Sequence, residues 1–377
     1  MRRFLLLVLL AVPLTAAAQS SQFGVRGLGQ PGRSLSAGAI GSGGAFGMFD
    51  SESSLNPAAL DGITAPTAVF TGVQALRSVE NPAGSESLQE SRFPLLLVAG
   101  PVRRFPLALG VTYTSYTSRD FTLATTDTLA LRDVLVPVND TLSSRGGISD
   151  LRLAASYRVA QGWAIGGGFH ILTGSNRVQF RRAFADDSYL TVNQQAELSY
   201  AGVGVSLGTI RRLGPGLAVA ALLRSDRYVG IDRDSARVSR VDLPYTFGLG
   251  VRYRLSQRLE LGTQGLFRTW SGANSDLLGQ GAPGARNTVE VSLGGEYLGD
   301  PRRPFRRPIR FGARYGTLPF PLSSGARPEE FGVSLGSGAR FAQQRAGIDL
   351  ALEYLWRSAG EFKERAFVVT VGVTVRP

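Results

Sequence analysis

Few residues of this sequence have the side chains that enzymes and metal sites use most. It contains one histidine, His170, and no cysteine. A hydrolase would need an activated serine and an acid beside that histidine, and no local motif supplies them. The acidic positions Asp186-Asp187, Asp232 and Asp234 offer the oxygen ligands that Ca²⁺ prefers, but solvated loop charge is the simpler explanation. The sequence therefore predicts no enzyme, no cofactor and no metal site.

The charge pattern argues against nucleic-acid binding. Lys and Arg number 41 against 29 Asp and Glu, and the only lysine is Lys363. The arginines are spread singly through strand-like segments and turns, with no basic helix and no lysine-rich tail. Lipid head groups and a polar barrel lumen explain such arginines better, so we expect no nucleic-acid partner.

Charged residues recur on one side of the strand-like segments. Glu290 and Glu296 lie on the segment before the one that carries Arg310 and Arg314, so ion pairs between neighbouring strands are expected. A structural ladder of charges in a polar lumen is one interpretation. The other is that Arg252, Arg310 and Arg314 contact the carboxylate of a ligand in the lumen. Alternation alone leaves both open.

These charged residues are expected to lie on β-strands, because apolar and polar residues alternate from residue 65 to the C-terminus. In the last segment Val369, Val371 and Val373 share one face, while Thr370 and Gly372 share the other. About fourteen such segments occur, each with the length of a transmembrane β-strand. We place them at residues 65–76, 92–101, 105–116, 148–159, 162–173, 197–210, 215–225, 242–255, 258–270, 287–298, 308–316, 330–341, 346–357 and 365–376.

The connections between these segments alternate in length. Short turns such as 103–104 alternate with long loops such as 117–147. Short periplasmic turns and longer extracellular loops are typical of outer-membrane barrels. The tryptophans Trp163, Trp270 and Trp356 lie at strand ends, where aromatic girdles meet the lipid head groups. We therefore expect an all-β, antiparallel transmembrane β-barrel.

The N-terminus predicts export. Residues 1–18 have the parts of a secretory signal peptide: Arg2-Arg3, an apolar run over 4–14, and a small-residue cleavage site before Gln19. The apolar run is too short to span a bilayer. We expect a protein of the bacterial outer membrane in which residues 65–377 form the barrel.

Residues 19–64 break the alternating pattern. They are rich in Gly, Ser and Ala, above all over 38–45, and such small residues do not suit lipid-facing strands. A compact plug, or hatch, folded back into the lumen fits them best. In Asn56-Pro57-Ala58, Pro57 fixes its own φ and Asn56 can bond nearby backbone, which predicts a fixed turn.

This segment resembles a known family. Residues 43–46, followed by Phe-Asp-Ser-Glu-Ser-Ser-Leu-Asn-Pro-Ala-Ala-Leu over 49–60, resemble the hatch of the FadL/OmpP1/TodX long-chain fatty acid transporters. The resemblance implies a channel for hydrophobic small molecules, with ligand entry from the extracellular loops and exit through a gap in the barrel wall. It assigns Asn56, Pro57 and Ala58 to the hatch, either as a gate or only as an anchor.

Two functions stay open at this point. The same pattern occurs in the related PorV/PorQ-type barrels of type IX secretion, which are closer to this chain in size. The protein is expected either to transport fatty-acid-like hydrophobic compounds or to act as a partner or shuttle protein in secretion. The partners expected are outer-membrane lipids, a hydrophobic ligand, the barrel-assembly machinery during biogenesis and, for the second function, a secretion translocon.

Overall fold

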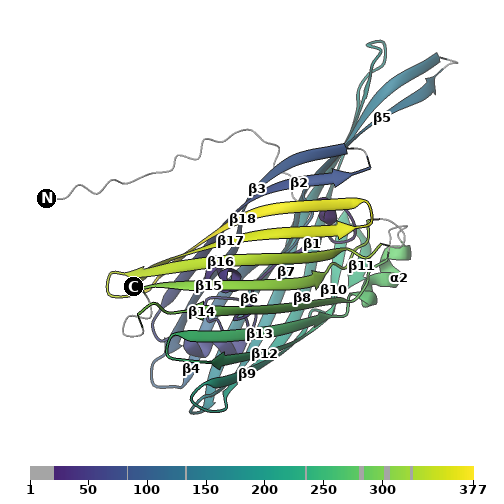
Figure 1. The fold of residues 1–377 in the computed structure, drawn as a ribbon. Coiled ribbons are helices and arrows are strands. Elements are labelled where there is room, and N and C mark those ends of the chain that lie inside the picture. Colours follow the sequence, from purple (N-terminus) through teal and green to yellow (C-terminus); the bar gives the residue numbers. More distant parts are fainter. Residues whose placement is uncertain are drawn as a thin grey trace.

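The computed structural model shows one antiparallel sheet that curves round and closes on itself (Figure 1). It describes residues 21–82, 84–131, 134–233, 236–279, 284–300, 306–322 and 326–377. The predicted signal peptide, residues 1–18, lies outside the described residues.

Within the described residues the sheet has 18 strands, of which 14 form the closed ring. The other four are not needed for closure: β1, β5 and β10 pair with ring strands, and β11 pairs with β10. The ring strands are β2 (Thr67–Asn81), β3 (Gly84–Val102), β4 (Leu107–Ser118), β6 (Val134–Ala160), β7 (Trp163–Phe184), β8 (Val192–Arg212), β9 (Leu217–Ser225), β12 (Tyr245–Arg254), β13 (Leu259–Arg268), β14 (Thr288–Tyr297), β15 (Arg306–Thr317), β16 (Glu329–Phe341), β17 (Ala346–Ala359) and β18 (Phe362–Val375).

Closure comes from the pairing of the last strand with the first ring strand. β18 pairs with β2 along almost its whole length. On β18 the side chains of Val371 and Val373 are exposed on the outside, while Thr370 and Thr374 are buried inside. Closing the ring pairs the two edges that an open sheet would expose to lipid, where unpaired backbone groups are costly. The predicted transmembrane barrel of about fourteen strands is confirmed, and each predicted segment overlaps one ring strand.

Several segments predicted as long loops are strands instead. Residues 117–147 contain β5 (Phe121–Leu131) and the outer part of β6, and residues 226–241 contain β10 (Tyr228–Arg233) and most of β11 (Ala236–Asp242). β5 and the outer parts of β6, β7 and β8 form a sheet that projects beyond the barrel, here called the extension (Figure 1). Strands that project into water need no continuous apolar face, so the alternation that revealed the ring fades there.

The N-terminal segment lies inside the ring, as the predicted plug. Its elements are η1 (Gln22–Gly24), β1 (Gln30–Pro31), α1 (Ala37–Gly41) and η2 (Pro57–Gly62). α1 lies against β15 to β18, and η2 lies against β4, β6, β7 and β8. Small residues are required here, because a Cβ on Gly41 would lie 2.9 Å from the Cα of Gly336 in the wall. The glycine-rich composition of the plug thus allows close backbone contact with the barrel.

Trp270 departs from the predicted aromatic girdle. Trp163 and Trp356 are exposed at 36% and 39%, but Trp270 is only 2% exposed and meets Phe320 edge-on at 5.2 Å between ring centres. The chain turns inward after β13 into η3 (Trp270–Ala273) and α2 (Asn274–Gly279), which carries the indole into an apolar cluster. In the part of the chain that the structure describes, no helix is long and apolar enough to cross a bilayer.

Candidate functional site

The Asn-Pro-Ala motif caps η2 and joins it to the wall. Asn56 Oδ1 accepts a hydrogen bond from the backbone N–H of Ala58 at 3.0 Å. Its Nδ2 donates to the carbonyl of Met48 at 3.1 Å and to that of Thr209 on β8 at 3.4 Å. Pro57 occupies the first turn of η2, where a missing N–H has no consequence. The Asn56 side chain therefore makes three hydrogen bonds, and Asn56 is 1% exposed.

Two glycines in the wall make room for this motif. A Cβ on Gly166 of β7 would overlap the backbone of Ala58, and a Cβ on Gly208 of β8 would overlap Asn56 Oδ1. The atoms of the motif cannot easily move aside, because the first clash is with backbone and Asn56 Oδ1 is held by its hydrogen bond to Ala58. The motif and these two glycines together form one docking point.

We expect Gly208→Ala to displace the motif from the wall. The added methyl group costs about 1–3 kcal/mol of overpacking, which the plug can relieve by leaving its position. Limited proteolysis of the purified barrel should show faster cleavage near residues 56–62 than in the parent protein. Gly167→Ala is the matched control, because the nearest atom to a Cβ there is 4.0 Å away. Equal cleavage of both variants would contradict the docking role.

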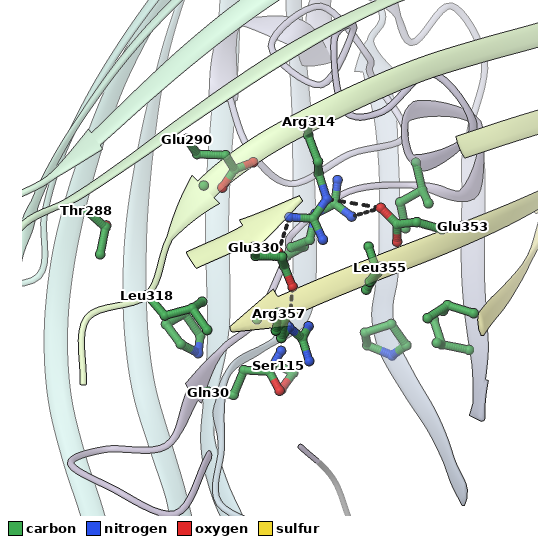
Figure 2. Close-up of a pocket in the computed structure, with 18 of the residues that line it drawn as sticks. Gln30, Ser115, Thr288, Glu290, Arg314, Leu318, Glu330, Glu353, Leu355 and Arg357 are labelled. Carbon is green, nitrogen blue, oxygen red and sulfur yellow. Dashed lines mark hydrogen bonds and ion pairs between the residues drawn. The ribbon is translucent and has the colours of Figure 1, made fainter. Parts of the chain in front are cut away.

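A cavity lies between the plug and the wall (Figure 2). Its floor is formed by the plug residues Gln30, Pro31, Arg33 and Ile40. Its walls combine charged and apolar side chains from β2, β3 and β13 to β18. The charged lining residues are Arg33, Arg77, Arg92, Arg268, Arg314, Arg357, Glu90, Glu290, Glu330 and Glu353, and the larger apolar ones are Ile40, Val73, Trp270, Leu318, Leu355 and Val368.

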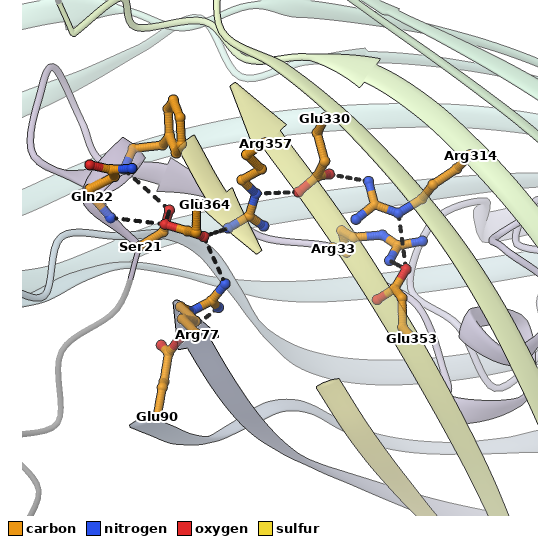
Figure 3. A network of polar contacts seen from close by, with 11 residues as sticks. Ser21, Gln22, Arg33, Arg77, Glu90, Arg314, Glu330, Glu353, Arg357 and Glu364 are labelled. Atoms are coloured by element: carbon orange, nitrogen blue, oxygen red, sulfur yellow. Dashed lines mark hydrogen bonds and ion pairs between the residues drawn. The ribbon is translucent and has the colours of Figure 1, made fainter. Parts of the chain in front are cut away.

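Most of the lining charges belong to one continuous series of ion pairs, here called the charge chain (Figure 3). It runs from the β4–β5 connection through the wall to the plug. In order, its members are Asp120, Arg92, Glu90, Arg77, Glu364, Arg357, Glu330, Arg314, Glu353 and Arg33. Each charge has an opposite neighbour, so the chain supplies fixed polarity to the cavity without net charge along its length.

The charge chain holds the plug at two points. Arg33 Nη1 lies 2.7 Å from Glu353 Oε1 of β17. At the other end of the plug, the Ser21 hydroxyl donates to Glu364 Oε2 of β18 at 2.7 Å. Glu364 and Glu353 are both at most 5% exposed in their side chains. Buried charges of this kind fix the relative position of plug and wall, since separating them leaves an uncompensated ion.

The three arginines predicted as ligand contacts are all engaged in ion pairs. Arg314 lines the main cavity and pairs with Glu330 and Glu353. Arg310 and Arg252 lie instead in a second, polar hollow beside Phe49 and Glu52. Arg310 pairs with Glu296 at 2.6 Å and with Asp349 at 2.7 Å, and Arg252 pairs with Glu260 at 2.9 Å. The carboxylate-binding role of these arginines stays a prediction.

The expected ion pairs between neighbouring strands are present in part. Glu296 pairs with Arg310, as the order of the segments predicts. Glu290 pairs instead with Arg268 of β13 at 3.3 Å. The plug also contributes an ion-pair partner, because Glu52 Oε1 lies 2.9 Å from Arg376 Nη2. Alternation along the strands does not predict this pair.

The wall opens where β3 and β4 separate. β3 pairs with β4 only from Leu95 to Val102, and the described residues of β3 before Leu95 pair only with β2. The outward side chains Phe93, Leu96 and Val98 are apolar and exposed, whereas Ser91 above them is polar. The separation therefore begins at the outer rim of the apolar belt.

Two features bridge this separation. The β1 strap, defined here as residues Gln30 to Gly32 of the plug, pairs with the free edge of β4 through Gln30–Ser118 and Pro31–Thr117. The N–H of Gly32 donates to the carbonyl of Tyr116 at 2.8 Å. Arg92 of β3 reaches Asp120 beyond β4 at 2.7 Å. The main cavity borders the same place, since Arg92, Ser115 and Gln30 all line it.

The lone histidine lies in a buried polar network that the sequence did not reveal. Both carboxylate oxygens of Asp150 on β6 lie 2.9 Å from His170 Nδ1 on β7. His170 Nε2 lies 2.9 Å from the hydroxyl of Ser206 on β8. Asp150 also pairs with Arg224 of β9 at 2.8 Å. These residue types match a hydrolytic triad, and their side chains are at most 3% exposed.

Two of the acidic loop positions, Asp186 and Asp232, are engaged in other contacts. Asp186 accepts hydrogen bonds from the hydroxyl and the N–H of Ser188, and these bonds lower the pKa of its carboxyl group. Asp232 pairs with Arg237, and Asp234 lies outside the described residues. Among the residues that the structure describes, no group of three or more metal-ligating side chains converges.

Solved structures share this fold. A Pseudomonas aeruginosa FadL homologue aligns with a TM-score of 0.65 at 13% identity, over 92% of this chain and 99% of its own. The Pseudomonas putida toluene transporter TodX aligns with 0.59 at 11% identity, over 92% and 99%. The CymD monoaromatic hydrocarbon channel aligns with 0.56 at 15% identity, over 94% and 99%. At such low identity the likeness shows the fold alone.

The sequence itself gives a second comparison. No curated protein matches the chain. Residues 1–212, more than half of the 377, match the family model described as BamG. Together with the closed ring and its apolar outer belt, this match identifies the chain as an outer-membrane β-barrel protein that belongs to the BamG family.

Proposed function

We propose that this protein carries hydrophobic small molecules into or across the outer membrane through the cavity between plug and wall. The observation that carries the proposal is the position of that cavity, which borders the separation of β3 from β4 at the outer rim of the apolar belt. A ligand that enters from the extracellular side has a lateral route to lipid there, if the β1 strap moves. The similar structures are a FadL homologue, a toluene transporter and a monoaromatic hydrocarbon channel, which supports the same class of ligand.

The lining of the cavity is compatible with such ligands. All of its charged side chains have an ion-pair partner among the described residues, so no lone charge penalises an apolar molecule. Ile40, Val73 and Leu355 provide apolar contact on the plug and the wall. The fixed dipoles of the ion pairs can in turn orient a polar group of the ligand.

An uptake assay tests the proposal directly. The protein is placed in liposomes that contain an enzyme able to oxidise toluene or a fluorescent fatty acid sensor, and entry is compared with protein-free liposomes. Faster entry of the hydrophobic probe, with unchanged leakage of a hydrophilic sugar of similar size, is the expected result. Equal entry of the probe with and without the protein would refute it.

The BamG match and the extension favour a partner role as the second candidate. The extension exposes large apolar side chains to water, among them Leu135 at 72% and Leu190 at 89%. Exposed apolar residues beyond the membrane suit contact with another protein, such as a component of barrel assembly or of secretion. Purification in mild detergent should then yield a stable complex, and shortening the β5–β6 hairpin should abolish it while uptake continues.

The buried Asp150–His170–Ser206 network serves structure rather than hydrolysis in this proposal. None of its three residues lines the main cavity, and Asp150 is shared with the guanidinium of Arg224. We expect a fluorophosphonate probe to leave Ser206 unlabelled in the folded barrel, as judged by mass spectrometry. Ser206→Ala should leave uptake unchanged and lower stability by about 1 kcal/mol, the contribution of a typical hydrogen bond. Labelling that disappears in Ser206→Ala would establish a hydrolytic centre instead.

A further inference from the structure

Three arginines point outward above the apolar belt on the β6–β7 face of the barrel. Arg145 of β6, Arg177 of β7 and Arg181 of β7 are all exposed. Below them on the same face of β7 lie Phe169 and Ile171, which are apolar and exposed to lipid. Arg177 is six positions beyond Ile171 on β7, which places it roughly 15 Å above Ile171 for a strand tilted as in outer-membrane barrels.

Arg145 and Arg177 are directly opposite each other on adjacent strands. Two like charges in this position repel each other, and the arrangement is unfavourable unless an anion lies between them. The neighbouring carboxylate, Glu197 of β8, does not remove the problem. Its oxygen is 3.9 Å from Arg177 Nη2, too far for a hydrogen bond, and both side chains are about half exposed.

A shallow hollow lies at this pair. Its lining is formed by Arg145, Gly146, Ser175, Arg177, Gln179 and Glu197. The two guanidinium groups and the Ser175 hydroxyl offer hydrogen-bond donors on the outer face, while the Gln179 amide donates to Gln195 Oε1 at 3.1 Å. Guanidinium groups hold phosphate oxygens with two parallel hydrogen bonds, which favours a phosphate over a carboxylate of single charge.

We propose that Arg145 and Arg177, with Arg181 four residues further out, bind the phosphorylated head group of an outer-leaflet glycolipid. The apolar belt lies below the site on the same face of the barrel and can hold the acyl chains of such a lipid, while a free anion gains nothing from that surface. The bound phosphate relieves the repulsion between the opposed guanidinium groups. It also fixes the base of the extension relative to the membrane surface, since all three arginines lie where the extension leaves the barrel. The site is independent of the transport route proposed above.

Native mass spectrometry of the full barrel can test this assignment. The barrel is reconstituted with bis-phosphorylated lipid A, with dephosphorylated lipid A, or with inorganic phosphate at matched concentration. The parent protein should retain bis-phosphorylated lipid A and lose the dephosphorylated form. Arg145→Gln/Arg177→Gln should weaken that retention by about tenfold or more, which corresponds to about 1.4 kcal/mol. Arg258→Gln, in a turn at the periplasmic end, is the control and should retain the lipid as the parent does.

Three outcomes would overturn the proposal. Equal retention by the double variant and the parent would place the lipid elsewhere. Equal retention of the two forms of lipid A would show that the phosphate is not recognised. Displacement of the lipid by an equal concentration of inorganic phosphate would show a free-anion site. The double variant should keep the heat-dependent gel shift of a folded barrel, because both side chains are exposed. A retained gel shift shows that a loss of lipid retention does not come from misfolding.

Discussion

Glu330→Ala is expected to destabilise the barrel by about 3–5 kcal/mol, because it leaves the buried ion network with one uncompensated positive charge. Glu330 of β16 lies between Arg314 and Arg357, and the three side chains are 7%, 3% and 4% exposed. Arg357 retains Glu364 and Arg314 retains Glu353, so each guanidinium keeps one carboxylate but loses the other. Urea unfolding in lipid vesicles, followed by tryptophan fluorescence, measures the change.

The control for this variant is an ion pair that water screens. Arg240 and Asp242 lie 3.3 Å apart on β11 with side chains 57% and 49% exposed. Asp242→Ala should cost no more than about 1 kcal/mol. If Glu330→Ala and Asp242→Ala shift the unfolding midpoint by the same amount, the buried charge chain contributes no more to stability than a solvent-exposed ion pair.

Period-two alternation was sufficient to predict the ring, because lipid on one side and the lumen on the other impose opposite polarity on successive residues. It failed wherever a strand leaves the membrane. Phe121–Leu131 of β5 contains four threonines and one aspartate, and no apolar face is required of it in water. Trp270 was misplaced for a related reason, since the strand ends before it and the chain turns inward.

The site was predictable only where its partners are neighbours in the ring. Arg310 and Glu296 lie on consecutive strands, so segment order alone suggests their pairing. The partner of Arg33 is Glu353, which is 320 residues away, and no periodicity specifies where a plug residue will touch the wall. The same limit applies to Asp150, His170 and Ser206. Alternation places all three inside, but it does not give the register that brings them within hydrogen-bond distance.

Locking the β1 strap to β4 is expected to stop uptake. Gln30 and Ser118 are opposite residues of an antiparallel pair, so their Cα atoms are separated by about 4.5–5.5 Å, within the range of a disulfide. The chain has no cysteine of its own, so Gln30→Cys/Ser118→Cys can form only the intended bond within one molecule. Under oxidising conditions, entry of a hydrophobic probe should fall to the level of protein-free liposomes, and reduction should restore it.

This result would follow from the position of the strap rather than from the disulfide itself. The strap covers the edge of β4 that β3 leaves free, and it forms part of the cavity floor, so a ligand cannot pass from cavity to lipid while it is fixed. Thr263→Cys/Leu293→Cys joins opposite residues of β13 and β14 in the intact wall and should not affect uptake in either state. Full uptake by the oxidised strap variant would place the exit elsewhere. The ion pair between Arg92 and Asp120 spans the same separation. If ligands leave between β3 and β4, Arg92→Ala should therefore speed uptake.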